Sequence, residues 1–199
     1  MSATSLRVAL LSPSYRPGAP CERESFAREL ADGLLAHGHQ PTIVAGHRGM
    51  PRRTIEGGVE IVRNWHPPEG RLERRMFECH LSHIPFSYLS LMRGAFDVAH
   101  ALHPTDAVAA GHWRTRTGRP AVLTYMGVPH RRTLASRRLR IEITQRAFAQ
   151  CSAVVVRSEE AAASCERWLG VRPRVIAGDS REALVEDYVA LYRGPEASL

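Results

Sequence analysis

Short apolar runs alternate with amphipathic stretches along this chain of 199 residues. A run that leads into a polar loop and then into a helix-like stretch is typical of a βα unit, and repeated βα units build a parallel sheet with helices on both faces. The runs lie at residues 7–11, 42–45, 59–62, 96–101, 121–125 and 153–156. The sequence therefore predicts an α/β fold with a single Rossmann-like, doubly wound parallel sheet.

Two amphipathic stretches are predicted to be helices that pack on this sheet. Residues 22–37 place Phe26, Leu30 and Leu34 on one stripe, and Gly38 follows as a helix end. Residues 181–193 place Leu184, Tyr188 and Leu191 on one stripe. Residues 71–92 read as helical with breaks. We expect residues 1–177 to form one domain and residues 178–199 to be a linker and a C-terminal helix on the same domain.

Size and composition indicate an ordinary globular protein. A chain of 199 residues accommodates one full α/β domain, and 44% hydrophobic and 24% charged residues are typical of a buried core. No leader-like N-terminus and no run of about 18 apolar residues is evident, so we expect a cytoplasmic protein. The cysteines also favour a reducing cytoplasm, because their wide spacing without a CxxC pair argues against a disulfide framework or a zinc site. They are Cys21, Cys79, Cys151 and Cys165.

The formal net charge of +7 comes from arginine alone, since the chain contains no lysine. Guanidinium groups bind phosphate in a bidentate manner, so an anionic ligand is a reasonable partner. The arginines gather at residues 71–75 and 131–140, and we expect either peripheral contact with an anionic membrane or a solvated basic face. No nucleic-acid recognition motif is present, so no nucleic-acid partner is expected.

Four segments, in order, resemble the N-terminal, acceptor-side lobe of two-lobed (GT-B) glycosyltransferases of family 4. The resemblance covers about residues 6–176 and rests on LLSPSYRPGAPCERESFARELADGLLAHGHQPTIVAG, FDVAHALHP, AVLTYMGVPHR and CSAVVVRSEEAAASCERWLGV. In this family a second lobe holds the sugar nucleotide. Here the chain runs after Val175 into a segment that resembles the terminal helix crossing back onto the first lobe, so the resemblance implies that the nucleotide-sugar lobe is missing.

Two positions depart from the family pattern. The glycine pair of the first loop aligns with Cys21 and Glu22, although Gly18 lies nearby. The histidine of the Thr-x-His-Gly strand end aligns with Met126, whose thioether cannot exchange protons as an imidazole does. No catalytic residue is therefore assigned.

Ligands of a doubly wound sheet bind at the carboxyl ends of its strands, so the loops at residues 12–24, 102–106, 126–132 and 157–160 are the candidate cleft. The candidate residues are Tyr15, Arg16, Gly18, His103, Tyr125, Gly127, His130 and Arg157. The alternative for each is that it only caps or packs its loop.

Metal and cofactor sites are not predicted. His37 and His39 stand at a helix end, where an imidazole is common. Cys79, His80 and His83 share a helical turn but lack a fourth ligand, which favours a surface helix over a metal site. The first strand is not followed by the GxGxxG fingerprint of dinucleotide enzymes.

The resemblance implies a hexosyl-type glycosyltransferase that is inactive alone. We favour an acceptor-binding or accessory subunit, which pairs with a separate nucleotide-sugar lobe or with itself and holds a glycan or lipid-linked acceptor. The alternatives are an autonomous minimal glycosyltransferase, another nucleotide-binding α/β enzyme, or a lone lobe with no activity of its own.

Overall fold

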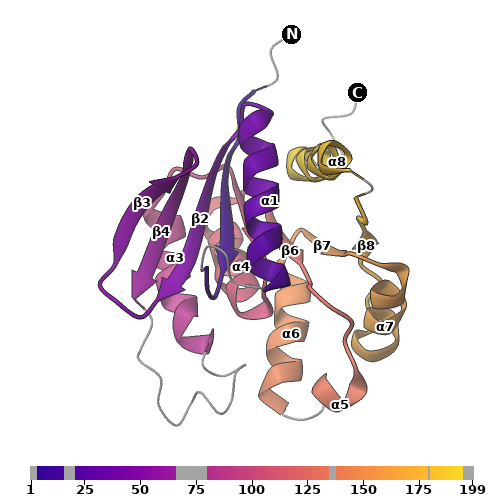
Figure 1. The fold of residues 1–199 in the computed structure, drawn as a ribbon. Coiled ribbons are helices and arrows are strands. Elements are labelled where there is room, and N and C mark those ends of the chain that lie inside the picture. Colours follow the sequence, from indigo (N-terminus) through magenta and orange to yellow (C-terminus); the bar gives the residue numbers. More distant parts are fainter. Residues whose placement is uncertain (1–3, 16–20, 66–79, 135–137, 179, 195–199) are drawn as a thin grey trace.

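A computed structural model describes residues 4–15, 21–65, 80–134, 138–178 and 180–194. These residues form one eight-stranded sheet in the order β3-β4-β2-β1-β5-β6-β7-β8 (Figure 1). The strands are β1 (Arg7–Ser12), β2 (Gln40–His47), β3 (Arg52–Glu56), β4 (Val59–Trp65), β5 (Val98–Ala101), β6 (Ala121–Thr124), β7 (Ala153–Val156) and β8 (Arg174–Val175). The helices are α1 (Glu22–Ala36), α3 (His83–Arg93), α4 (Pro104–Thr117), α5 (Arg131–Leu134), α6 (Arg138–Gln150), α7 (Glu159–Leu169) and α8 (Arg181–Arg193), with a 3-10 turn at His80–Ser82.

The sheet is doubly wound, as the apolar runs predict. The chain builds outward from β1 to β2 and β4, and then returns to place β5 on the other side of β1. All neighbouring strands are parallel except β3 and β4, which are antiparallel. The strand order therefore reverses between β1 and β5, and the carboxyl ends of these two strands form the switch point where ligands of such sheets bind.

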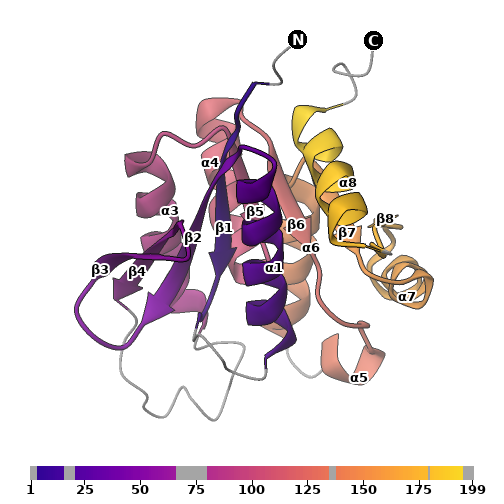
Figure 2. The same ribbon diagram turned by 45° about the horizontal axis from the view of Figure 1, so that its top comes forward.

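Alternating residues of each strand serve two apolar layers. In β1, Val8 and Leu10 face one side, and Ala9 and Leu11 face the other. The first layer is covered by α1 and α8, which lie side by side in Figure 2. The second is covered by α3, α4, α6 and α7. Both faces of the central strands are thus buried, which explains why those strands read as continuous apolar runs.

Helix ends follow local sequence chemistry. Ser158 begins α7 and Ser180 begins α8, because each serine hydroxyl accepts a hydrogen bond from the backbone N–H three residues later. Gly38 ends α1 in the left-handed region at φ 78°, as its position after the apolar stripe predicts.

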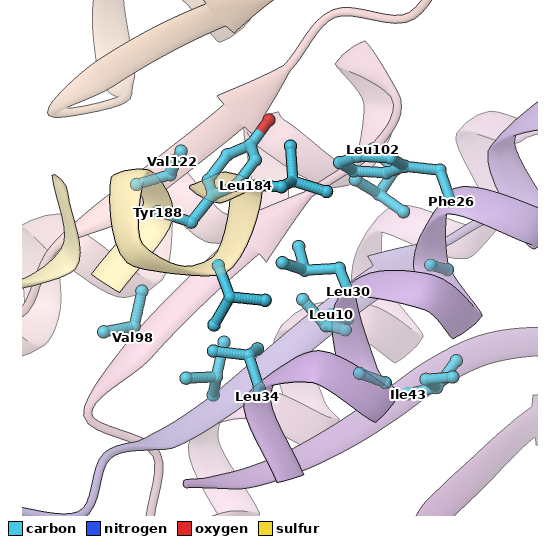
Figure 3. Close-up of a cluster of buried hydrophobic side chains, with 14 of the residues drawn as sticks. Leu10, Phe26, Leu30, Leu34, Ile43, Val98, Leu102, Val122, Leu184 and Tyr188 are labelled. Atoms are coloured by element: carbon cyan, nitrogen blue, oxygen red, sulfur yellow. The ribbon is translucent and has the colours of Figure 1, made fainter. Parts of the chain in front are cut away.

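The C-terminal helix packs on the lobe, as predicted, through a slightly different stripe. Its buried residues are Leu184, Val185, Tyr188, Val189 and Tyr192. Leu191, which the sequence placed on the stripe, is only partly buried. Leu191 still packs against the core, because it lies three residues after Tyr188 and seven after Leu184, at the edge of the same helix face. Figure 3 shows Tyr188 and Leu184 beside Phe26 of α1 and Val122 of the sheet.

A row of three buried hydrogen bonds joins α8 to the sheet. The Tyr192 hydroxyl lies 2.6 Å from His100 Nδ1, and His100 Nε2 lies 2.7 Å from Thr124 Oγ1. Thr124 Oγ1 lies 2.7 Å from the Tyr188 hydroxyl. Burial lowers the pKa of His100 to about 3. The imidazole is therefore neutral at pH 7, with one nitrogen donating and the other accepting.

The sequence analysis missed the two edge strands. Strand β3 was not predicted because it lacks an apolar run: Arg52, Arg53 and Ile55 are exposed on an edge strand that contributes little to the core. The glycine pair Gly57 and Gly58 did indicate a turn. These residues have φ of 55° and 80°, and two successive positive φ angles make the tight hairpin that joins β3 to β4. β8 has only two residues. The helical prediction for residues 71–92 holds for residues 83–92, which belong to α3, and residues 71–79 lie outside the described part.

Among the residues that the structure describes, no helix is both long and apolar enough to cross a membrane.

Candidate ligand site at the carboxyl edge of the sheet

A cavity of about 190 Å³ opens at the switch point. The ends of β1 and β5 are held together there by a hydrogen bond of 2.9 Å from Leu102 N to the Leu11 carbonyl. The cavity is lined by Arg23, Leu102, His103, Pro104, Tyr125, Met126, Arg140 and Thr144. These residues come from the start of α1, the junction of β5 and α4, the loop after β6, and α6. The fold thus brings together four segments that are far apart in the sequence.

His103 caps α4, and this role sets its protonation. Its Nδ1 accepts a hydrogen bond of 3.3 Å from Thr105 N and lies 2.7 Å from Thr105 Oγ1. A backbone N–H only donates, so Nδ1 is unprotonated and the imidazole proton sits on Nε2. Burial, followed by the charges of Arg23, His80, His83 and Arg140, lowers the pKa of His103 well below its ordinary value. At pH 7 His103 is therefore a neutral hydrogen-bond donor through Nε2.

A buried polar cluster joins α3 to the first turn of α4. Asp106 Oδ1 lies 2.8 Å from His83 Nδ1 and accepts a hydrogen bond of 2.9 Å from Ser87 Oγ. All three residues are fully buried. The cluster ties α3 to the helix that His103 caps, and His80 packs its ring 5.0 Å from the His103 ring. The expectation of a surface helix is wrong for His83, because this imidazole has a carboxylate partner inside the core.

Tyr125 and Met126 form the β6 side of the cavity. The Tyr125 ring packs edge-on against Phe148 at 5.7 Å, and burial raises the pKa of Tyr125 to about 12. Its phenol therefore keeps its proton at neutral pH and remains a donor. Met126 occupies the position where the family has a histidine, and it adds an apolar, proton-inert wall.

The cavity is cationic. Arg23 and Arg140 supply two guanidinium groups from α1 and α6, and the described lining residues include no carboxylate. Arg23 Nε is buried, and no group in the described part of the chain accepts its hydrogen. Buried donors are nearly always paired, so this atom marks a place for an acceptor. The lining therefore suits an anion.

No metal centre is found among the residues the structure describes, where no three His, Cys, Asp or Glu side chains are placed to hold an ion. The two histidines after α1 bind the backbone instead. His37 Nδ1 lies 2.9 Å from the Gly33 carbonyl, and His39 Nδ1 accepts from Leu6 N at 3.2 Å.

Two of the eight residues proposed from the sequence, His103 and Tyr125, line the cavity. His130 is exposed and lines a separate cavity of about 340 Å³ against α7. Gly127 is exposed beside Met126, with φ 86°. Arg16 and Gly18 lie outside the described residues.

The other two proposed residues serve the lobe itself. Tyr15 is buried in the core, and the Arg63 guanidinium lies 6.0 Å from its ring centre. Arg157 donates a hydrogen bond of 2.8 Å to the Ala177 carbonyl and lies 4.9 Å from the ring centre of Phe26. These contacts match the packing alternative that the sequence analysis left open.

Sequence reasoning missed Arg23 and Thr144 and left Arg140 inside a general basic cluster. One signal was available for α6, because Arg140, Thr144 and Phe148 are spaced four apart and share a helix face with a buried aromatic ring. By contrast, Arg131, Arg132 and Arg138 are exposed. No local signal marks Arg23, since only the tertiary fold turns the start of α1 toward α6.

A doubly wound lobe of this kind is the class of fold found in glycosyltransferase structures. A chain of sucrose-phosphate synthase from Thermosynechococcus elongatus aligns with TM-score 0.70 and 17% identity over 94% of this chain and 97% of that chain. A second structure of that synthase gives TM-score 0.69 and 15% identity over 85% of this chain and 46% of its own. HepE from Anabaena, in complex with UDP and glucose, gives TM-score 0.56 and 12% identity over 84% of this chain and 42% of that chain.

The family follows from the sequence. The model of Glycosyltransferase Family 4 matches residues 24–177, so the chain belongs to glycosyltransferase family 4. The sequence resemblance to the N-terminal lobe is thereby confirmed. No curated protein matches the chain. The chain spans less than half of the second synthase structure and of HepE.

Proposed function

We propose that this chain is the acceptor-binding lobe of a glycosyltransferase and that the sugar donor is held by a nucleotide-sugar lobe outside these 199 residues. The observation that supports this role is the cavity at the switch point, which four segments of the lobe build. Its open side lies at the carboxyl edge of the sheet, where the donor lobe sits in two-lobed transferases.

Catalysis needs more than this cavity provides. Glycosyl transfer requires stabilisation of a leaving nucleoside diphosphate and alignment of the acceptor hydroxyl with the donor carbon. Met126 offers no base, and the His103 imidazole caps α4 through Nδ1, which accepts a hydrogen bond from Thr105 N. The lobe is therefore suited to holding an acceptor rather than activating a donor.

The chain alone is expected to show no turnover of a panel of nucleotide sugars, measured as release of nucleoside diphosphate. Two matched variants serve as controls. Gly127→Trp places a bulky side chain beside the cavity, and Gly118→Trp does the same at the far end of α4; both glycines have positive φ, 86° and 73°, and open space at Cβ. Turnover that Gly127→Trp abolishes and Gly118→Trp preserves would establish an autonomous transferase.

The carboxyl edge of the sheet is proposed as the docking face for the nucleotide-sugar lobe. A lone nucleotide-sugar lobe encoded beside this chain is the partner to express with it. Sedimentation velocity is expected to show a 1:1 complex that transfers sugar, and Gly127→Trp should weaken the complex at least about tenfold, or about 1.4 kcal/mol. Gly118→Trp should leave it intact. Self-association through the same face, or equal effects of both variants, would count against this docking mode.

A further inference from the structure

We propose that β3 pairs edge to edge with β3 of a second copy of this chain, antiparallel and about a two-fold axis, so that two lobes share one continuous sheet. β3 ends the strand order, and among the described residues no strand lies on its outer side. Helices α1 and α3 cover the next two strands, β4 and β2, and Figure 1 shows β3 at the outer end of the sheet. This surface lies away from the switch point between β1 and β5, so the inference goes beyond the proposed acceptor role.

The hairpin determines which backbone groups of β3 point outward. In a two-residue hairpin the residues that flank the turn exchange hydrogen bonds, and bonded and non-bonded pairs then alternate along the two strands. Glu56 flanks the turn, so it and every second residue before it bond β4. The N–H and C=O groups of Arg53 and Ile55 therefore point away from β4. Within the described part of the chain, no other backbone hydrogen bond engages them.

One register gives all four of these groups a partner within the strand. When Arg53 lies opposite Ile55 of the second copy, each such pair exchanges two hydrogen bonds, and Thr54 lies opposite itself on the two-fold axis. If Arg53 faced its own counterpart, Ile55 would face Pro51, which has no N–H. A shift the other way sets Arg53 opposite Gly57, which lies in the turn. The backbone therefore specifies a single self-pairing.

The charged side chains are complementary in this register. Arg52 and Glu56 share the face of β3 on which Arg63 donates to the Glu56 carboxylate at 2.8 Å. Arg52 lies opposite Arg63 in the β3–β4 pair and forms no ion pair with any described residue, so two like charges are neighbours. The self-pairing sets Arg52 opposite Glu56 of the second copy, once on each side of the axis. Opposite charges that face each other across two strands stabilise the pair.

The same register covers exposed apolar side chains. Met50 and Ile55 are the most exposed large apolar side chains of the described residues, at 83% and 77%. Ile55 faces the aliphatic stem of Arg53 of the second copy and lies diagonal to the second Ile55. The register, continued beyond the strand, sets Met50 opposite Gly58, where a Cβ atom would lie 3.0 Å from Leu35 Cδ2. Leu35 is itself exposed, so an apolar contact flanks the paired strands at each end.

Sedimentation velocity of the full chain tests the inference. The paired edge is short, and small interfaces form weak complexes, so we expect a sedimentation coefficient that rises toward that of a dimer between about 1 and 300 µM. Arg52→Glu replaces both cross-strand ion pairs by like-charge pairs and should weaken the dimer at least about tenfold. Arg116→Glu is the matched control, because it changes the net charge equally at an exposed position on α4.

Oxidative cross-linking tests the register. Thr54→Cys places two cysteines opposite each other on the axis, where non-bonded pairs have Cα atoms about 4.5 Å apart, within the range that a disulfide spans. Thr115→Cys, exposed on α4, is the matched control, and the unsubstituted chain gives the background from the native cysteines. We expect a covalent dimer above this background from Thr54→Cys only. Thermal melts confirm that each variant is folded.

Three results overturn the inference. The first is a chain that stays monomeric to about 300 µM and gives no Thr54→Cys dimer. The second is equal weakening by Arg116→Glu. The third is association that Gly127→Trp abolishes and Arg52→Glu preserves, because this result places the contact at the carboxyl edge of the sheet. Since β3 lies outside that edge, failure of the β3 dimer leaves the proposed acceptor role standing, and failure of the donor-lobe complex leaves the β3 dimer standing.

Discussion

Replacing Tyr188 by alanine is expected to destabilise the lobe by about 3–5 kcal/mol, the usual cost of removing a large buried aromatic side chain. Tyr188 is fully buried between α8 and the sheet. Its ring packs against Phe26 at 6.0 Å and against His100 at 5.0 Å, and its hydroxyl bonds Thr124. The substitution leaves a cavity at the centre of this contact, so α8 loses its main anchor.

Urea unfolding measures this effect: the urea concentration at half unfolding should fall, while the dependence of the unfolding free energy on urea concentration (the m-value) stays the same. Tyr188→Phe keeps the ring and removes one hydrogen bond, so it should cost about 0.5–1.5 kcal/mol. Glu186→Ala, on the exposed side of the same helix, should change stability by less than about 0.5 kcal/mol. A loss below about 1 kcal/mol for Tyr188→Ala would mean that α8 is not docked on the lobe in solution.

Stability is expected to fall steeply as the pH drops from 7 to 5, and His100 is a principal cause. The unfolded chain takes up a proton at the ordinary histidine pKa of about 6.5. Buried His100 has its pKa lowered to about 3, so the folded state does not take up that proton in this range. The unfolded state therefore binds more protons below pH 6.5, and each pH unit there removes about 1.4 kcal/mol of stability.

Unfolding free energies at pH 7, 6 and 5 check this dependence. His100→Gln should lower stability at pH 7, because the row of hydrogen bonds is broken, but it should also reduce the slope by about 1.4 kcal/mol per pH unit. His103 adds to the slope in the same direction, since its pKa is also lowered. His112→Gln is the control for replacing a histidine outside the core, because that side chain is exposed. An unchanged slope in His100→Gln would show that His100 is hydrated in solution.

The range from pH 7 to 5 separates histidine from carboxylate effects. Asp97 has its pKa lowered by its hydrogen bond with Arg7, and Glu56 has its pKa lowered, against the effect of burial, by its hydrogen bond with Arg63. Their contributions are present above their ordinary pKa values and are lost only as the pH falls further. Acid unfolding below about pH 4 therefore adds these two groups to the histidine effect.

Only some residues of the candidate site could be predicted from the sequence. His103 and Tyr125 were found because each lies at the carboxyl end of an apolar run, and the carboxyl ends of parallel strands meet at one edge. Tyr15 and Arg157 satisfy the same rule, but Tyr15 is buried in the core and Arg157 packs over the Phe26 ring. Position along a strand determines the edge at which a residue lies, and packing determines whether its side chain faces a ligand.

The sequence alone determined the parallel sheet, the C-terminal helix and the family, because short-range periodicity and the order of motifs reflect backbone hydrogen bonding and burial that each segment needs for itself. Only the tertiary structure brought Arg23 and Arg140 to one cavity, and only it paired His83 with Asp106 and His100 with Tyr192. These contacts join residues 23 to 117 positions apart in the chain, so they depend on how helices from different βα units pack on one sheet. Local sequence patterns contain no information about those distances.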